Sequence, residues 1–222
     1  MNTRKLRMAA LVLAAGLSGA AQAALHDRGE GLIYDDVLNV TWLQDANYAK
    51  TSGYDTDGWM TWQDSKDWAA NLNYYDVERG VTYDDWRLPS TLQFDSSCEI
   101  QSGAGSYGIG CTGSEMGHLF YADLGGVAGS PITLTHNANY NLFQNLQADY
   151  YWSGTGYPPN NTYHAWAFIT LDGYQYWYLT TLEISAWAVR DGDVAAVPEP
   201  ETYAMMLAGF GLVGAAARRR RG

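Results

Sequence analysis

The chain has 222 residues, and its 24 Asp and Glu outnumber its 13 Lys and Arg, which gives a formal net charge of −11. This length suits one domain with appendages, and an apolar content of 47% argues against a chain that is disordered throughout. The acidic balance argues against a nucleic-acid partner, because phosphate contacts need clustered Lys and Arg.

Residues 1–23 have the parts of a secretory signal peptide. Three basic residues precede an uncharged apolar stretch from Met8 to Ala20, and Ala21–Ala23 supplies a small-x-small cleavage site. The apolar stretch is short for a membrane-spanning helix, which needs about 20 residues, so a cleaved signal is favoured over a retained anchor. We therefore expect the mature chain to begin at Ala24.

Residues 197–222 form a second targeting segment. An acidic Pro-Glu-Pro sequence at 198–200 precedes 16 uncharged residues, 202–217, and four consecutive arginines follow them. The uncharged run is near the short end for a membrane helix, and an arginine cluster stays on the cytoplasmic side. Export of the N-terminus requires the same orientation, so we expect a C-terminal membrane helix with the domain outside the cytoplasm.

This tail resembles the PEP-CTERM sorting signal of Gram-negative bacteria. In that family a membrane-bound exosortase recognises and processes the tail, and the proteins are associated with exopolysaccharide and biofilm. The resemblance implies an exosortase partner, transient anchoring in the membrane, and then the cell surface or the extracellular matrix. The sorting residues that it implies are Pro198, Glu199, Pro200, Arg218, Arg219, Arg220 and Arg221.

Residues 24–196 form the exported domain, and this domain is more acidic than the whole chain. Seven of the basic residues and two of the acidic ones lie in the targeting ends, which leaves 6 basic and 22 acidic residues and a net charge of −16. Such a surface repels acidic polymers and nucleic acid unless a divalent cation bridges them.

Hydrophobic periodicity predicts few helices and many strands in this domain. The clearest helix start is Thr61, with Asp64 three residues later in the capping-box position. Asp172-Gly173 between two strand-like runs predicts a hairpin, and helices before late antiparallel strands predict an α+β domain. In chain order we expect strands at 31–34 and 41–43, a helical turn at 44–49, a helix at 61–74, a strand at 86–88, a helix at 114–124, and strands at 150–153, 164–171, 174–179 and 186–190.

Four sequence blocks within residues 29–191 carry a second resemblance. The most specific is Asp85-Trp86-Arg87-Leu88-Pro89-Ser90, in which Asp84 or Asp85 is expected to pair with Arg87. The other blocks are Tyr34-Asp35 with Thr41-Trp42, Thr61-Trp62 before Ala69-Ala70, and Tyr151-Trp152-Ser153 followed by Ala165-Trp166, Asp172-Gly173 and Ala186-Trp187-Ala188-Val189-Arg190. Together they resemble the Lcl C-terminal domain family, a bacterial extracellular domain of unassigned activity. The resemblance implies a C-type-lectin-like fold with a twisted antiparallel sheet, two helices and long loops, and it transfers no catalytic residue.

The two cysteines, Cys98 and Cys111, flank most of a glycine-rich stretch at 102–113 that we expect to be a surface loop. In an exported domain the default for such a pair is a disulfide that closes the loop. The alternative is a reactive pair, as in the formylglycine-generating type of enzyme with a related lectin-like fold, although the surrounding motif of that enzyme is not evident.

Metal and catalytic signals in the sequence are weak. Asp55 and Asp57, followed by Gly58, are the best calcium candidates, but Trp59 stands where an EF-hand loop needs its next ligand. Solvated acidic loops are therefore the favoured interpretation, and no cofactor is required. The histidines lack metal-ligand spacing and no G-x-S-x-G motif is present, so the sequence favours a protein that is not an enzyme, with a Ser–His–Asp site assembled across the fold left open.

The best binding candidate is the aromatic region late in the chain. Tyr174, Tyr176 and Tyr178 alternate along one expected strand and share a face, whereas Gln175 and Trp177 share the other. One face must pack on the core, and the other is free to expose rings that stack on sugars, unless it serves sheet packing alone. The candidate ligand patch is Tyr157, Tyr163, Tyr174, Tyr176, Trp177 and Tyr178. The tryptophans expected in the core are Trp42, Trp62, Trp86 and Trp187.

Three functions follow from these observations, in order of preference. The first is a non-enzymatic surface protein that binds or organises extracellular polysaccharide. The second is a purely structural component of the matrix, and the third is an enzyme that acts on exported polymers.

Overall fold

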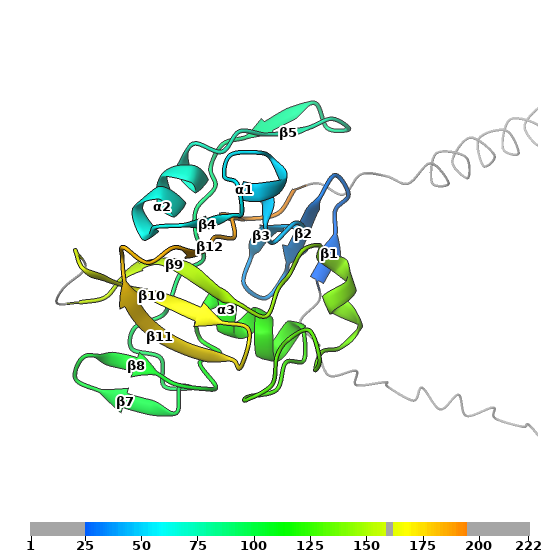
Figure 1. Ribbon diagram of the computed structural model, residues 1–222. Coiled ribbons are helices and arrows are strands. Elements are labelled where there is room, and N and C mark those ends of the chain that lie inside the picture. Colours follow the sequence, from blue (N-terminus) through cyan, green and yellow to red (C-terminus); the bar gives the residue numbers. More distant parts are fainter. Residues whose placement is uncertain (1–24, 159–161, 195–222) are drawn as a thin grey trace, which may run out of the picture.

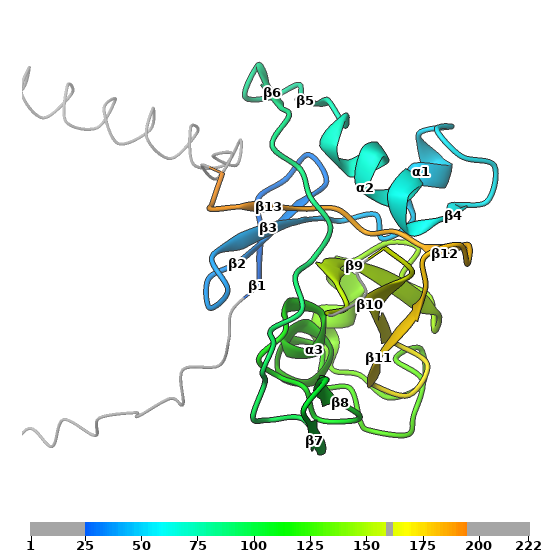
Figure 2. The ribbon, with the colours of Figure 1, turned by 90° about the vertical axis from the view of Figure 1, so that its left-hand side faces the viewer.

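The computed structural model describes residues 25–158 and 162–194. Figures 1 and 2 show two sheets that lie next to each other, with short helices and two small hairpins around them. This mixture of helices and mostly antiparallel strands confirms the α+β class. The predicted signal peptide at 1–23 and the sorting tail at 197–222, including its membrane helix, lie outside the described residues.

The first sheet brings together the beginning and the end of the described chain. Its strand order is β1-β2-β3-β13, and every neighbouring pair is antiparallel. A tight turn joins β2 to β3, in which the Asp35 carboxylate accepts hydrogen bonds from the backbone N–H groups of Val37 and Leu38. The strands are β1 (Leu25–Asp27), β2 (Leu32–Asp35), β3 (Val40–Leu43) and β13 (Val189–Asp191).

The second sheet has the strand order β11-β10-β9-β12-β4. Its antiparallel strands β9, β10 and β11 follow one another along the chain, and β12 pairs with β9 in parallel. Gly173 adopts a φ of 78° between β10 and β11, which confirms the predicted Asp172-Gly173 hairpin turn. The strands are β4 (Trp59–Met60), β9 (Tyr150–Gly156), β10 (His164–Ile169), β11 (Tyr174–Leu179) and β12 (Ile184–Ser185).

Two hairpins stand beside these sheets. One pairs β5 (Tyr74–Asp76) with β6 (Val81–Tyr83), and the other pairs β7 (Ile100–Ser102) with β8 (Gly105–Tyr107). The second hairpin occupies part of the stretch that was expected to be only a glycine-rich loop. Reciprocal backbone hydrogen bonds join Gly108 to Gln175, so the chain after β8 continues along the edge of β11.

The cysteine prediction is confirmed. Cys98 and Cys111 form a disulfide with their Cα atoms 4.1 Å apart. The side chain of Asp95 organises the same loop, because it accepts hydrogen bonds from Ser97 and from the backbone N–H of Gly113.

The helices are short: α1 (Tyr48–Thr51), α2 (Trp62–Ala70), α3 (Glu115–His118), the π-helical turn η1 (Leu119–Asp123) and the 3₁₀ helix η2 (Ala138–Leu142). Thr61 caps α2 as predicted, since its hydroxyl oxygen accepts a hydrogen bond from the N–H of Asp64. The helix ends four residues earlier than expected. The side-chain amide of Asn71 donates a hydrogen bond to the backbone carbonyl of Asp67, and Tyr74 already belongs to β5. The helical turn expected at 44–49 lies instead at α1.

One predicted strand and one predicted ion pair are wrong, and a second predicted strand is right only in part. Residues 86–88 form a single bridge, from Arg87 to Val189. Of the strand expected at 186–190, residues 189 and 190 belong to β13, whereas residues 186–188 are irregular. Because the 85–87 segment runs antiparallel beside β13, its charged side chains meet partners across the bridge and not along their own segment. Asp85 therefore binds Arg190 at 2.7 and 2.9 Å.

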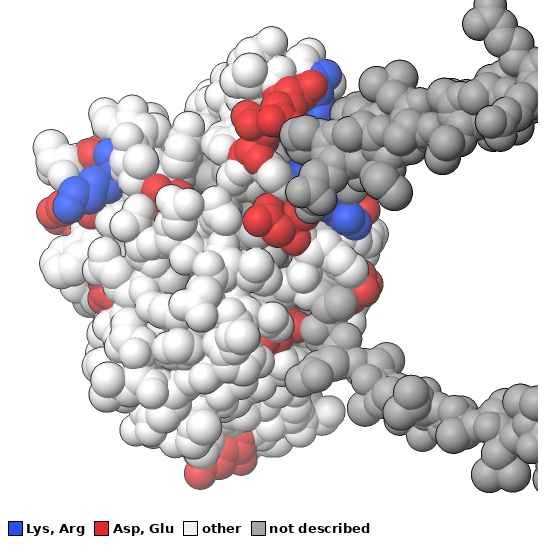
Figure 3. All heavy atoms as spheres, turned by 90° about the vertical axis from the view of Figure 1, so that its right-hand side faces the viewer, with Lys and Arg blue, Asp and Glu red and all other residues white. Residues whose placement is uncertain are grey.

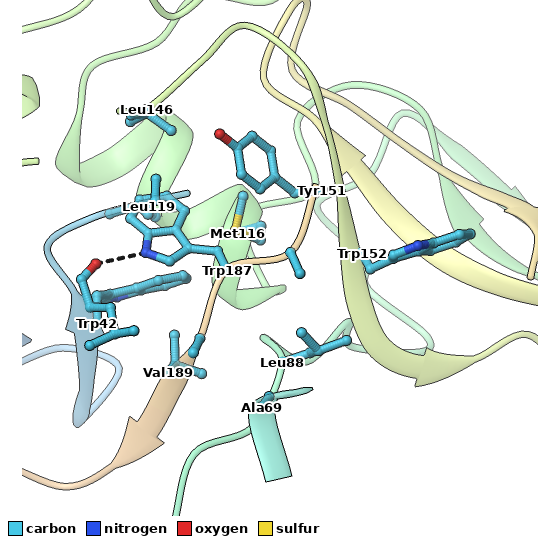
Figure 4. Packing of buried hydrophobic residues seen from close by; sticks show 14 of the residues in the cluster. Trp42, Ala69, Leu88, Met116, Leu119, Leu146, Tyr151, Trp152, Trp187 and Val189 are labelled. Atoms are coloured by element: carbon cyan, nitrogen blue, oxygen red, sulfur yellow. Dashed lines mark hydrogen bonds between the residues drawn. The ribbon is translucent and has the colours of Figure 1, made fainter. Parts of the chain in front are cut away.

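The core lies between the two sheets and centres on Trp187, as Figure 4 shows. The Trp187 indole N–H donates to the carbonyl of Leu43 at 2.7 Å, and its ring centroid lies 4.9 Å from that of Trp42. This inward turn of Trp187 explains why residues 186–188 leave the strand. Trp42, Trp86 and Trp187 are buried as predicted, whereas Trp62 is half-buried and donates to the carbonyl of Ser153.

Within residues 25–158 and 162–194, no helix has both the length and the apolar character that a membrane crossing requires.

Candidate functional site

The predicted aromatic patch lies on β11, at the edge of the second sheet. Tyr174, Tyr176 and Tyr178 stand opposite Ile169, Ala167 and Ala165 of β10, so the three tyrosines share one face. All three are half-buried. On the other face Gln175 is only 1% exposed and packs into the domain, whereas Trp177 is half-buried.

Folding adds two tyrosines that sequence reasoning missed. Tyr107, next to the bridge between β8 and β11, has its ring centroid 5.5 Å from that of Tyr176. The ring centroid of Tyr150 on β9 lies 5.4 Å from that of Tyr178. Neither has a local sequence signal, because strand pairing alone brings them to β11. We call the resulting set the tyrosine surface, and its members are Tyr107, Tyr150, Tyr174, Tyr176 and Tyr178.

The hydroxyl groups of the tyrosine surface have no intramolecular hydrogen-bond partner among the described residues. Other half-buried tyrosines differ, since Tyr74 and Tyr121 each donate to a backbone carbonyl. Burial, with smaller effects from neighbours such as Tyr150 and Asp172, raises the pKa of Tyr178 to about 12. Its hydroxyl therefore stays protonated at neutral pH and is able both to donate and to accept hydrogen bonds.

The remaining members of the predicted patch have different positions. Trp177 lies between Tyr157 and Tyr176, nearly parallel to both, at centroid distances of 4.4 and 4.0 Å. It also packs at 5.5 Å against the fully buried Trp166, so Trp177 and Tyr157 support the patch from its inner side. Tyr163 is 62% exposed and has no aromatic partner in the described part of the chain.

A cavity of about 530 Å³ forms a second candidate site, between α2 and the Asp85–Ser90 motif. Lys66 projects at this place with its ammonium 3.6 Å from the ring centre of Trp62, and it forms no ion pair with a described residue. Arg87, by contrast, is bound to the carboxylates of Glu115 and Asp191. The lining residues are Lys66, Ala70, Trp86, Arg87, Leu88, Ser90, Gly154 and Thr155.

The weak calcium candidates Asp55 and Asp57 have structural partners. The carboxylate of Asp55 accepts from the N–H groups of Asp57 and Gly58, and that of Asp57 accepts from the N–H of Trp59. Within the two described ranges, no third carboxylate, histidine or cysteine joins them. The expectation of a solvated acidic loop, with calcium as the weaker alternative, stays a prediction.

Charge is distributed in small groups. On the face drawn in Figure 3, acidic side chains occur in separate clusters, several of them beside a basic side chain, and no continuous basic surface is visible. Each of the four arginines in the described ranges is paired with a carboxylate: Arg28 with Asp193, Arg79 with Asp76, Arg87 with Glu115 and Asp191, and Arg190 with Asp85.

Comparison with known proteins finds two family matches. The PEP-CTERM protein-sorting motif matches residues 196–221, which include every predicted sorting residue, and supports export and sorting by an exosortase. No curated protein and no solved structure matches the chain, so the C-type-lectin-like fold stays a prediction. The Lcl C-terminal domain model matches residues 31–190, which is most of the chain and nearly all of the described structure. The chain therefore belongs to the Lcl C-terminal domain family.

Proposed function

We propose that this protein is an exosortase-sorted surface protein whose Lcl C-terminal domain binds an extracellular polysaccharide without catalysing a reaction on it. The observation that carries the proposal is the tyrosine surface, which combines half-exposed rings with hydroxyl groups that have no partner among the described residues. Rings of this kind offer an apolar platform for the C–H faces of sugars. The phenolic hydroxyls are the complement to the hydroxyl groups at the edges of the sugar rings.

The charge of the domain favours a neutral polysaccharide as the ligand. The tyrosine surface contains no charged residue, and the domain around it has a net charge of −16 over residues 24–197. Long-range repulsion therefore opposes an acidic polymer and leaves a neutral one unaffected.

Affinity electrophoresis of the mature protein through gels containing a neutral or an acidic polysaccharide tests this proposal. We expect retardation by a neutral polymer and about tenfold weaker binding for Tyr176→Ala, since loss of one stacked ring costs about 1.4 kcal/mol. Tyr176→Phe keeps the ring and loses the hydroxyl, which costs about fivefold for one hydrogen bond. The matched control is Tyr75→Ala, because Tyr75 is 60% exposed on the separate β5–β6 hairpin.

Two outcomes contradict the proposal. One is the absence of retardation by any polysaccharide, which favours a purely structural matrix component. The other is binding of acidic polymers alone that Lys66→Ala abolishes and Tyr176→Ala leaves unchanged, because this would assign binding to the cavity beside α2.

A further inference from the structure

A buried group of three ligand-type side chains lies away from the tyrosine surface. Asp35 ends β2, His118 ends α3, and Asp123 ends η1. One donor atom from each lies within 4.8 Å of the others, and His118 Nε2 is 3.7 Å from Asp123 Oδ1. Asp35 is completely buried and Asp123 is 1% exposed.

No N–H or O–H group of another described residue donates to four polar atoms of this group, and Asp35 and Asp123 are close enough to share a proton. The four atoms are Asp35 Oδ2, His118 Nε2, and both carboxylate oxygens of Asp123. Leaving such atoms buried and unpaired is costly, and for two adjacent carboxylates mutual repulsion adds to the cost. Apart from His118, no basic side chain forms an ion pair with either carboxylate in the described ranges.

The local backbone brings the side chains to this arrangement. In an α-helix, residues five apart such as 118 and 123 point about 140° away from each other. The π-helical turn η1, with its hydrogen bond from Leu124 N–H to the Leu119 carbonyl, brings them to the same side. Asn137 and Asn139 both donate to the backbone carbonyl of Asp123, which fixes the end of that turn.

We propose that Asp35, His118 and Asp123 form a binding site for one divalent transition-metal ion, with Zn²⁺ or Mn²⁺ favoured over Ca²⁺. The donor set of one imidazole nitrogen and two carboxylates suits these ions, whereas Ca²⁺ is bound by oxygen alone. Ligands about 2.1 Å from a zinc ion lie at most about 4.2 Å apart, so the 3.7 Å separation of His118 and Asp123 is already suitable. The remaining donor separations are all within 4.8 Å.

The geometry of Asp35 also agrees with a cation at this place. The other oxygen of Asp35 is held by the N–H groups of Val37 and Leu38, so its free oxygen is directed by the backbone. A bound ion would join the first sheet, through β2, to the α3–η1 segment.

Metal analysis of the mature protein, after treatment with a chelator and dialysis against ZnCl₂, MnCl₂ or CaCl₂, tests the site. We expect one Zn²⁺ or Mn²⁺ per chain and a melting temperature about 5–10 °C higher at a hundredfold excess over the dissociation constant. Asp123→Asn and His118→Gln should remove both effects. His136→Gln is the matched control and should keep both, because His136 is an exposed histidine and is not one of the three grouped ligand residues.

The same variants distinguish metal binding from a proton shared between the two carboxylates. Asp123→Asn removes the repulsion and is expected to fold, with a melting temperature in chelator at least equal to that of the unaltered protein. The proposal is overturned if the unaltered protein binds none of the three metals. It is equally overturned if Asp123→Asn and His118→Gln leave metal binding unchanged, or if calcium binds in preference to zinc and manganese.

Discussion

Arg87 and Glu115 form the ion pair that we expect to matter most for stability. Two guanidinium N–H groups of Arg87 meet the two carboxylate oxygens of Glu115 at 2.8 Å each, and the Ser90 backbone N–H adds a third bond at 2.6 Å. The Glu115 side chain is only 13% exposed. Hydrogen bonding to Glu115 is the largest cause that raises the pKa of Arg87 above its ordinary value.

The perturbation is Glu115→Gln, which keeps the size of the side chain and removes its charge. A glutamine retains one acceptor oxygen, so one of the two hydrogen bonds from Arg87 and the ionic attraction are lost. Hydrogen bonds to charged groups contribute about 1.5–3 kcal/mol, and Arg87 is 34% exposed, so we expect the free energy of unfolding to fall by about 2 kcal/mol.

The matched control is Asp193→Asn. Asp193 accepts two hydrogen bonds from the guanidinium of Arg28, at 2.8 and 2.6 Å, in the same two-bond arrangement. Because the Asp193 side chain is 38% exposed, its loss should cost less than about 1 kcal/mol. Urea unfolding of the mature, oxidised protein, followed by tryptophan fluorescence, measures both values. Equal destabilisation by the two substitutions would refute the reasoning that burial decides the strength of these pairs.

Two further predictions concern the core and the response to acid. Trp187→Phe should lower the free energy of unfolding by about 2–3 kcal/mol in the same urea assay, because it removes a buried hydrogen bond and leaves a cavity among well-packed rings. The hydrogen bond from Arg190 is the main cause that lowers the pKa of Asp85, so this stabilisation is present above the unfolded pKa of about 4 and is lost as the pH falls through the lower folded value. Asp85→Asn should therefore flatten the acid side of a plot of melting temperature against pH, and an unchanged acid side would contradict it.

Local sequence patterns predicted the elements that depend on neighbouring residues. The strand at 174–179 has the predicted bounds, because alternating aromatic residues between turn signals identify it without help from the rest of the chain. The Thr61 cap and the Asp172-Gly173 turn are likewise decided within four residues. The face shared by Tyr174, Tyr176 and Tyr178 followed from the two-residue period of a strand.

Contacts between distant segments were beyond such patterns. Trp187 leaves its expected strand because the carbonyl of Leu43, far away in the chain, accepts its N–H. Tyr107 joins the tyrosine surface only because β8 lies beside β11. The group around Asp123 depends both on β2 and on a π-helical turn, and the helical periodicity of residues 114–124 predicts an ordinary α-helix there.

The position of β13 has a consequence for a domain under tension. β13 belongs to the sheet that also contains β1, and Figure 2 shows it at a distance from β11, the strand that carries most of the tyrosine surface. A pull between a ligand held there and whatever follows Val194 would cross the whole body of the domain. At the C-terminal end this load would fall on the three paired residues of β13 and on Trp187, whose ring is lodged in the core behind them. The buried ring of Trp187 would then resist extraction of β13, and the domain would unfold under force only when its core is disrupted.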